Sequence, residues 1–193
     1  MALTIWTPYI APGASAECLD DDTLAEQIRA VALVLQDSYE QQPSDPKDTM
    51  LASRMWAGFP LALAIRGMVF AEELSIKRNR TDLVPQDDLS YIMSAAKELE
   101  EAAEPRDDPP WMGDPDVHRS HRSNLDRQKL VSATEFPSNP PKMPLLWPQL
   151  TQDDPRGYRL RLSSADTILL ARRLRALPPW LRYDKNKREV LPA

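Results

Sequence analysis

The sequence is poor in the residues that build cross-linked or glycine-rich sites. Cys18 is its only cysteine, which excludes an intramolecular disulfide or a cluster of cysteine ligands and favours a reducing compartment, so we expect a cytoplasmic protein. Its five glycines form no glycine-rich phosphate loop. The longest apolar run, around residues 57–65, contains Pro60 and ends at Arg66, and no Lys or Arg precedes the apolar residues at the N-terminus. We therefore expect neither a signal peptide nor a membrane span.

Proline and charge are plentiful but unevenly placed. Ten of the 19 prolines lie between Pro105 and Pro155, a stretch that also holds Trp111 and Trp147. Large aromatic residues are typical of an ordered wrap, because flexible linkers are rich in Gly and Ser. Residues 1–150 carry 14 basic and 24 acidic side chains, whereas residues 151–193 carry 10 and 5. The net charge of −5 argues against nonspecific coating of nucleic acid and leaves a local basic site open.

Apolar residues recur at three- and four-residue steps in several segments, which predicts helices. We expect helices over residues 22–37, over about 48–77 with a kink at Pro60, and over about 86–104. The inward residues are expected to be Leu24, Ile28, Val31, Ala32 and Leu35 in the first helix, and Leu89, Ile92, Met93, Ala96, Leu99 and Ala103 in the third. Asp114 before Pro115 predicts the N-cap of an unusually polar fourth helix. Ser163 and Asp166 form a capping pattern that predicts a basic C-terminal helix ending at Pro178.

Together these segments predict an all-α fold of four to five helices in a single domain. We expect a helical core over residues 1–104, a proline-rich ordered wrap over 105–160, and a basic C-terminal helix and tail over 161–193. Residues 3–9 are expected to be a short extended segment outside any sheet. The five tryptophans are expected to pack in the core, with stacking on nucleic-acid bases as the alternative.

Both histidines of the protein, His118 and His121, lie one helical turn apart in the predicted fourth helix. With Arg122 and the neighbouring serines they are suited to hold phosphate oxygens, because guanidinium groups donate paired hydrogen bonds and hydroxyls add short ones. The alternative is a polar helix whose His and Ser side chains hydrogen-bond to the proline-rich wrap. Two histidines can also share a metal ion, but no further ligand has a diagnostic spacing, so we expect neither a metal nor a cofactor.

Each end of the sequence has more than one interpretation. Met1 is followed by the small Ala2, which predicts removal of the methionine and a free α-amine that can act as a Schiff-base nucleophile. Many inert proteins begin in the same way. The basic residues near the C-terminus predict either a phosphate-binding stripe or a surface that docks on the acidic body of the same protein.

Five segments carry a family resemblance: TIWTPY at residues 4–9, LDDDTLAEQIRAVALVL at 19–35, RMWAGFPLALAIRGMVFAEE at 54–73, PPWMGDPDVHRSHRSNL at 109–125 and LLWP at 145–148. Together they resemble the pyrimidine-dimer DNA glycosylase family, small all-α proteins typified by the phage endonuclease V, and especially its phage and bacterial relatives of unassigned function. The resemblance covers about residues 3–148. The basic C-terminal helix lies outside it.

The resemblance implies a DNA-repair scaffold whose members flip a base out of the stack and attack the sugar with the N-terminal amine. A glutamate on the first helix, beside an arginine, assists them. Placed without gaps, the arginine falls on Arg29 and the glutamate on Ala30, while Glu26 lies one turn earlier on the same side as Arg29. The implied catalytic residues are Ala2 and, as a substitute carboxylate, Glu26. The implied nucleic-acid-binding residues are Arg29, Arg54, His118, His121 and Arg122.

Two functional hypotheses follow from the sequence. The first is a DNA-glycosylase-like, nucleic-acid-associated protein that cleaves the N-glycosidic bond of a damaged or modified pyrimidine through its N-terminal amine. The second is a non-enzymatic interaction or assembly protein on the same scaffold, with a protein partner or self-association in place of DNA. Ala30, the acidic run Asp20–Asp22 and the net charge favour the second hypothesis.

Overall fold

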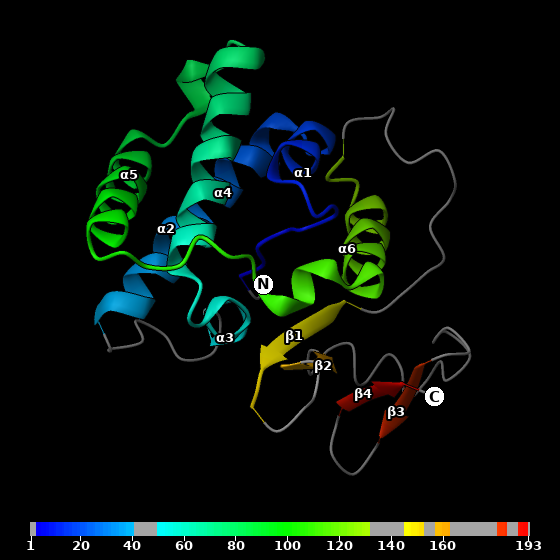
Figure 1. Cartoon of the computed structure of the whole chain (residues 1–193). Coiled ribbons are helices and arrows are strands. Elements are labelled where there is room, and N and C mark those ends of the chain that lie inside the picture. Colours follow the sequence, from blue (N-terminus) through cyan, green and yellow to red (C-terminus); the bar gives the residue numbers. More distant parts are fainter. Residues whose placement is uncertain are drawn as a thin grey trace. The chain divides into compact units, whose positions relative to one another are not determined.

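The chain divides into two units, Met1–Pro109 and Pro110–Ala193, and each is described by itself. The computed structural model describes residues 3–40, 50–131, 145–152, 157–162, 181–184 and 189–192 (Figure 1). The boundary between the units lies close to residue 105, where the sequence predicts that the helical core ends.

The first unit is built from helices around α2. Its elements are α1 (Pro12–Cys18), α2 (Asp21–Glu40), α3 (Met50–Trp56), α4 (Pro60–Glu72), the π-helical turn η1 (Glu73–Lys77), the 3-10 turn η2 (Thr81–Leu83) and α5 (Gln86–Glu101). Helices α2, α4 and α5 pack against one another (Figure 1). The five residues of α2 that the periodicity places inward are all fully buried, so this prediction is confirmed.

The predicted helix over residues 48–77 is broken rather than kinked. Helix α3 ends at Trp56, and Gly58 has a φ of +78°, which a glycine adopts without a steric penalty. Pro60 then occupies the first turn of α4, where its missing N–H leaves no hydrogen bond unmade. The proline therefore starts a new helix instead of bending an existing one.

Pro12 starts α1, again in the first helical turn. Two smaller predictions for the first unit are wrong. Met93 points away from the core, with 56% of its surface exposed. Ala103 follows the end of α5 with a left-handed φ of 55° and is exposed. Residues 3–9 form no strand, as expected.

The second unit combines a helix with a sheet. It contains the 3-10 turn η3 (Pro110–Gly113), α6 (Pro115–Gln128) and strands β1 (Leu146–Leu150), β2 (Tyr158–Leu162), β3 (Leu181–Asp184) and β4 (Glu189–Pro192). The Asp114 side chain caps α6 by accepting a 2.9 Å hydrogen bond from the Asp116 amide, as predicted. The strands form one antiparallel sheet in the order β1-β2-β4-β3.

The sheet corrects the all-α prediction: the protein is mostly helical but not purely so. Strands β1 and β2 occupy the end of the expected proline-rich wrap, and β3 and β4 lie within the expected C-terminal helix and tail. Pro148 is tolerated in β1 because β1 is an edge strand, where one row of backbone groups needs no partner strand. The C-terminal helix predicted from Ser163 lies outside the described residues.

Four tryptophans are core residues, as predicted. Trp6, Trp56, Trp111 and Trp147 are each at most 4% exposed, and Trp180 lies outside the described residues. Within the described parts of the chain, no helix is both long and apolar enough to cross a bilayer.

Gly67 is the point of closest approach between α4 and its two neighbours. A Cβ added there would lie 2.8 Å from Val31 Cγ1 on α2 and 3.1 Å from Ile92 Cδ1 on α5. Because the branched valine side chain has little rotamer freedom, the helices themselves would have to move apart.

We expect Gly67→Ala to lower the free energy of unfolding by about 1–3 kcal/mol through overpacking. The matched control is Gly13→Ala in α1, where an added Cβ meets nothing within 4 Å, so we expect no loss or a gain of up to about 1 kcal/mol from helix propensity. Urea unfolding followed by circular dichroism measures both. Equal effects at the two sites would contradict the close approach.

Candidate functional site

The N-terminal segment lies in the core of the first unit and is clamped to α2 by one side chain. Ile5, Trp6 and Thr7 are at most 4% exposed. Gln27 accepts a 2.6 Å hydrogen bond from the Trp6 amide through Oε1 and donates a 2.9 Å bond to the Thr4 carbonyl through Nε2. A single buried glutamine therefore satisfies two backbone groups of this non-helical segment and fixes its register on the helix.

A second polar anchor holds the turn that follows this segment. Ser15 of α1 accepts a 3.2 Å bond from the Tyr9 amide and donates a 2.9 Å bond to the Tyr9 carbonyl. Arg66 of α4 donates to Ser15 Oγ and to the Ile10 carbonyl, and its guanidinium lies 5.7 Å from the centre of the Trp56 ring. Burial lowers the pKa of Arg66 to about 10, against the opposing charge of Asp108.

Glu26 and Arg29 lie on the narrow exposed stripe of α2. Both are exposed, which confirms that they share one side of the helix. Ala30, at the position where the resemblance places a glutamate, is 2% exposed and packs in the core. Arg54 on α3 is also exposed. Within the described residues no ion pair joins these side chains, so the carboxylate and both guanidinium groups face solvent.

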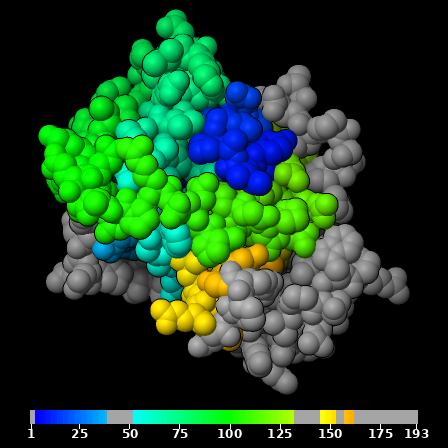
Figure 2. Space-filling view, in the orientation of Figure 1, coloured from blue at the N-terminus to red at the C-terminus, as the bar shows by residue number. Residues whose placement is uncertain are grey.

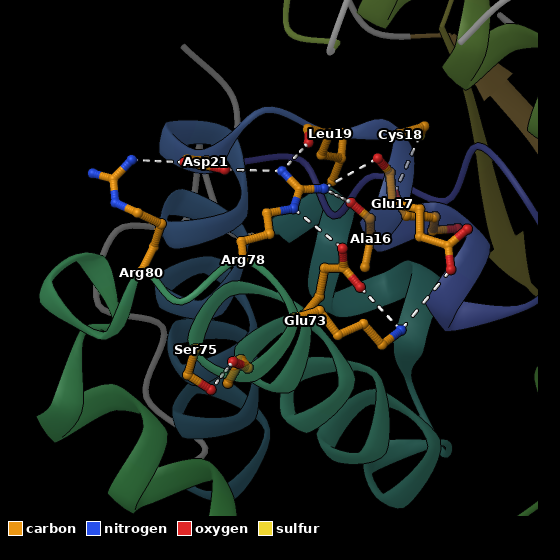
Figure 3. Close-up of polar contacts among 12 residues, drawn as sticks. Ala16, Glu17, Cys18, Leu19, Asp21, Glu73, Ser75, Arg78 and Arg80 are labelled. Atoms are coloured by element: carbon orange, nitrogen blue, oxygen red, sulfur yellow. Dashed lines mark hydrogen bonds and ion pairs between the residues drawn. The ribbon is translucent and has the colours of Figure 1, made fainter. Parts of the chain in front are cut away.

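The acidic run at the start of α2 serves the fold. Asp20 accepts a 2.8 Å hydrogen bond from the Thr23 amide and so caps the helix. Asp21 accepts a 2.9 Å bond from Arg78 and a 2.8 Å bond from Arg80 (Figure 3). Two of the three carboxylates therefore have structural partners, and Asp22 is exposed.

Arg78 ties together three elements of the first unit (Figure 3). Its five N–H donors reach the carbonyls of Ala16, Glu17 and Leu19 at the end of α1, Asp21 at the start of α2, and Glu73 in η1. Burial alone would lower the pKa of Arg78, but hydrogen bonds to Asp21 and Glu73 outweigh it and raise the pKa. The side chain is thus a charged cap for the C-terminus of α1.

The histidines of the second unit are buried in α6. His118 is 4% exposed and donates from Nε2 to the Met112 carbonyl at 2.6 Å, while His121 is fully buried. Ser120 accepts a 3.2 Å bond from the Leu146 amide. These contacts support the interpretation of a polar helix bonded to the neighbouring proline-rich segment.

The arginines of α6 do not share one face with the histidines. Arg119 is exposed and pairs with Asp116 at 3.3 Å, whereas Arg122 is half-buried. The helix therefore presents no joint face of imidazole and guanidinium groups to solvent in this conformation. Among the residues that the structure describes, no group of three or more His, Cys, Asp or Glu side chains is placed to hold a metal ion.

The candidate residues fall into separate groups. Glu26, Arg29 and Arg54 belong to the first unit, the two histidines and Arg122 belong to the second, and Ala2 lies outside the described residues. Sequence reasoning missed Gln27, Arg66 and Arg78. A polar or charged residue inside an apolar helical repeat is the only signal that points to Gln27 and Arg66, and it does not name their partners.

No protein-family model matches the chain, and neither a curated protein nor a solved structure gives a significant match. The resemblance to the glycosylase family therefore stays a prediction.

We expect Arg78→Lys to lower the free energy of unfolding by about 1–3 kcal/mol, because one ammonium group cannot reach acceptors that a planar guanidinium serves from five directions. Arg80→Lys is the matched control, because Arg80 is more exposed and binds only carboxylates, so a small effect is expected. Chemical denaturation measures both variants. A loss for Arg80→Lys as large as that for Arg78→Lys would contradict the proposed cap.

Proposed function

We propose that the protein is a DNA-glycosylase-like, nucleic-acid-associated protein whose N-terminal amine attacks the sugar of a damaged pyrimidine nucleotide. The observation that carries this proposal is the Gln27 clamp. It holds the N-terminal segment on α2, the same helix that carries Glu26 and Arg29. The family resemblance supplies the chemistry, and the clamp supports it.

The clamp matters because the ends of protein chains are usually loosely held, whereas a nucleophile must be positioned. The Thr4 carbonyl is fixed to Gln27, and at about 3.5 Å per residue the Ala2 amine can lie no more than about 10 Å from it. This bound limits how far the amine can move from α2, whose exposed side carries Glu26 and Arg29.

The proposed step is a substitution at the sugar carbon C1′. The unprotonated Ala2 nitrogen forms a bond to C1′, and the bond from C1′ to the base nitrogen breaks. The base leaves with the bonding electrons and takes up a proton. Glu26 accepts a proton from the attacking amine, Arg29 and Arg54 bind phosphates, and opening of the sugar ring then gives an imine between Ala2 and C1′.

One observation favours a second candidate function, a non-enzymatic interaction or assembly protein. Ala30 is apolar and only 2% exposed at the position of the expected glutamate. The first unit also carries 20 acidic against 9 basic side chains, a balance that repels a polyanion. Such a protein would self-associate or bind a protein partner and would carry no amine chemistry.

Borohydride trapping tests the proposal, since it reduces an imine to a stable amine. We expect the purified protein to form a covalent adduct with duplexes that contain a pyrimidine dimer or an abasic site, but not with intact duplex. Acetylation of the α-amine should abolish the adduct. Glu26→Gln should slow dimer-dependent trapping by roughly 100-fold, whereas the matched exposed variant Glu98→Gln on α5 should not change it.

Absence of an adduct on every damaged duplex, combined with self-association in analytical ultracentrifugation, would reject the glycosylase proposal in favour of the second candidate.

Position 30 gives a separate test by gain of function. We expect Ala30→Glu to trap dimer-containing DNA faster than Ala30→Gln, because the two variants have similar volume and differ in the carboxylate that the resemblance assigns to this position. Rates are compared at equal folded fraction, since burial of either side chain lowers stability. Equal rates would show that position 30 does not face the reacting amine.

A further inference from the structure

Helix α1 and the turn before it present an outer face that is nearly free of charge. The buried residues of α1 are Ser15, Ala16 and Cys18. On the other side, exposed and half-buried residues of the turn and the helix form what we call the α1 outer face: Ile10, Ala11, Gly13, Ala14 and Glu17. No residue between positions 3 and 16 is charged. Ile10 is 54% exposed, and an exposed isoleucine on an uncharged surface is a candidate for burial by a partner.

The α1 outer face is held rigidly from behind. A helix of seven residues is marginal on its own in water, and α1 is fixed by side chains that bond it to other elements. Ser15 bonds both backbone groups of Tyr9, and Arg66 of α4 donates a 2.9 Å hydrogen bond to the Ile10 carbonyl. Arg78 caps the other end of the helix. A surface that is fixed before it meets a partner loses little conformational entropy on binding.

The exposed faces of the long helices in the same unit are charged instead. Six exposed carboxylates stand on α2 and α5: Asp22, Glu26, Asp87, Glu98, Glu100 and Glu101. The first unit as a whole carries 20 acidic and 9 basic side chains, so two copies of it repel each other. The α1 outer face is therefore a surface through which two copies can approach without bringing rows of carboxylates together.

The one carboxylate of the α1 outer face has a base beside it. Glu17 and Lys77 of η1 form a loose ion pair of 3.9 Å, and 59% and 49% of their side chains are exposed. A two-fold symmetric contact uses the same surface twice, so Glu17 of one protomer meets Lys77 of the other, and the reverse. Ile10 and Glu17 lie about 10 Å apart along the helix, within the area of about 800 Å² that a typical interface buries on each protomer.

We propose that the α1 outer face is the contact between two copies of this chain in a two-fold dimer. Ile10 supplies the apolar anchor, and two reciprocal pairs of Glu17 with Lys77 fix the register. The N-terminal residues, blue in Figure 2, form part of the visible surface of the protein. This inference goes beyond the proposed function, because a dimer is compatible both with the amine chemistry and with its absence.

Sedimentation velocity of the full-length chain across micromolar concentrations tests the dimer. We expect the wild-type protein to shift from monomer to dimer as its concentration rises. Ile10→Asp should raise the dissociation constant at least about tenfold, because burial of an apolar side chain is lost. Leu33→Asp is the matched control: Leu33 is 42% exposed on the charged face of α2, so we expect an unchanged dissociation constant.

Gly13→Glu separates association from folding. A Cβ at Gly13 meets nothing within 4 Å, and a glutamate in the first turn of a helix favours the helix. We therefore expect unchanged or higher stability, together with a dissociation constant raised by roughly tenfold or more through charge on the contact surface. Urea unfolding measures the stability of each variant at a concentration where it is monomeric.

Charge reversal tests the reciprocal pairs. Glu17→Lys and Lys77→Glu should each weaken self-association, because each places like charges opposite one another. An equal mixture of the two variants should form a heterodimer, since both pairs are then restored across the contact. A mixture that associates no better than either variant alone would overturn the reciprocal pairing.

The outcomes for the dimer and for the chemistry are distinguishable. A wild-type protein that stays monomeric at every concentration overturns the dimer, and so does a dimer that neither Ile10→Asp nor Gly13→Glu weakens. A dimer that both variants weaken, with Leu33→Asp unchanged, supports it. Trapping of damaged DNA by a monomeric protein overturns the dimer alone, whereas a dimer that traps no DNA overturns the chemistry alone.

Discussion

The guanidinium of Arg78 is the interaction on which the arrangement of the first unit depends. The end of α1 and the start of α2 are separated by two residues, and Arg78 donates to the carbonyls of Ala16, Glu17 and Leu19 at this junction. Arg78 supplies five donors from a single planar group, and its position after η1 couples the end of α4 to both helices. The π-helical turn places Glu73 and Arg78 so that acid and base meet at the same point.

That junction also determines where the N-terminal segment can lie. Ser15 holds the Tyr9 turn, and Gln27 holds the Thr4 carbonyl and the Trp6 amide, so the segment enters the core with these backbone groups satisfied. The polar side chains buried in this region therefore fix the position of the N-terminal segment and have no reactive role of their own. Any chemistry at the amine depends on these anchors, although none of them would touch a substrate.

Sequence periodicity predicted the helices because one-sided burial leaves a repeating pattern, as the buried face of α2 shows. The periodicity failed for prolines that begin a helix and for a short strand whose side chains alternate between two faces. Pro12 and Pro60 interrupt a pattern in sequence but begin helices in space. The side chains of β2 alternate, with Tyr158 and Leu160 on one face and Arg159 on the other. Because the strand has only five residues and its partner strand was not recognised, its arginines were interpreted as part of a stripe of basic residues. The partner strand β1 contains Pro148, and a proline argues against a strand in sequence, so β1 was not predicted either.

The candidate site was less predictable than the fold, because a residue's type does not reveal which way it faces. Two histidines separated by one turn suggest a reactive pair in sequence, but α6 buries both, and His118 bonds a backbone carbonyl. Conversely, Arg159 and Arg161 are assigned to one face only by the cross-strand register, which places Arg161 opposite both Trp147 of β1 and Glu189 of β4. The alternation along β2 separates the buried Tyr158 and Leu160 from the half-buried Arg159 and Arg161, and a run of basic residues in the sequence does not reveal this division.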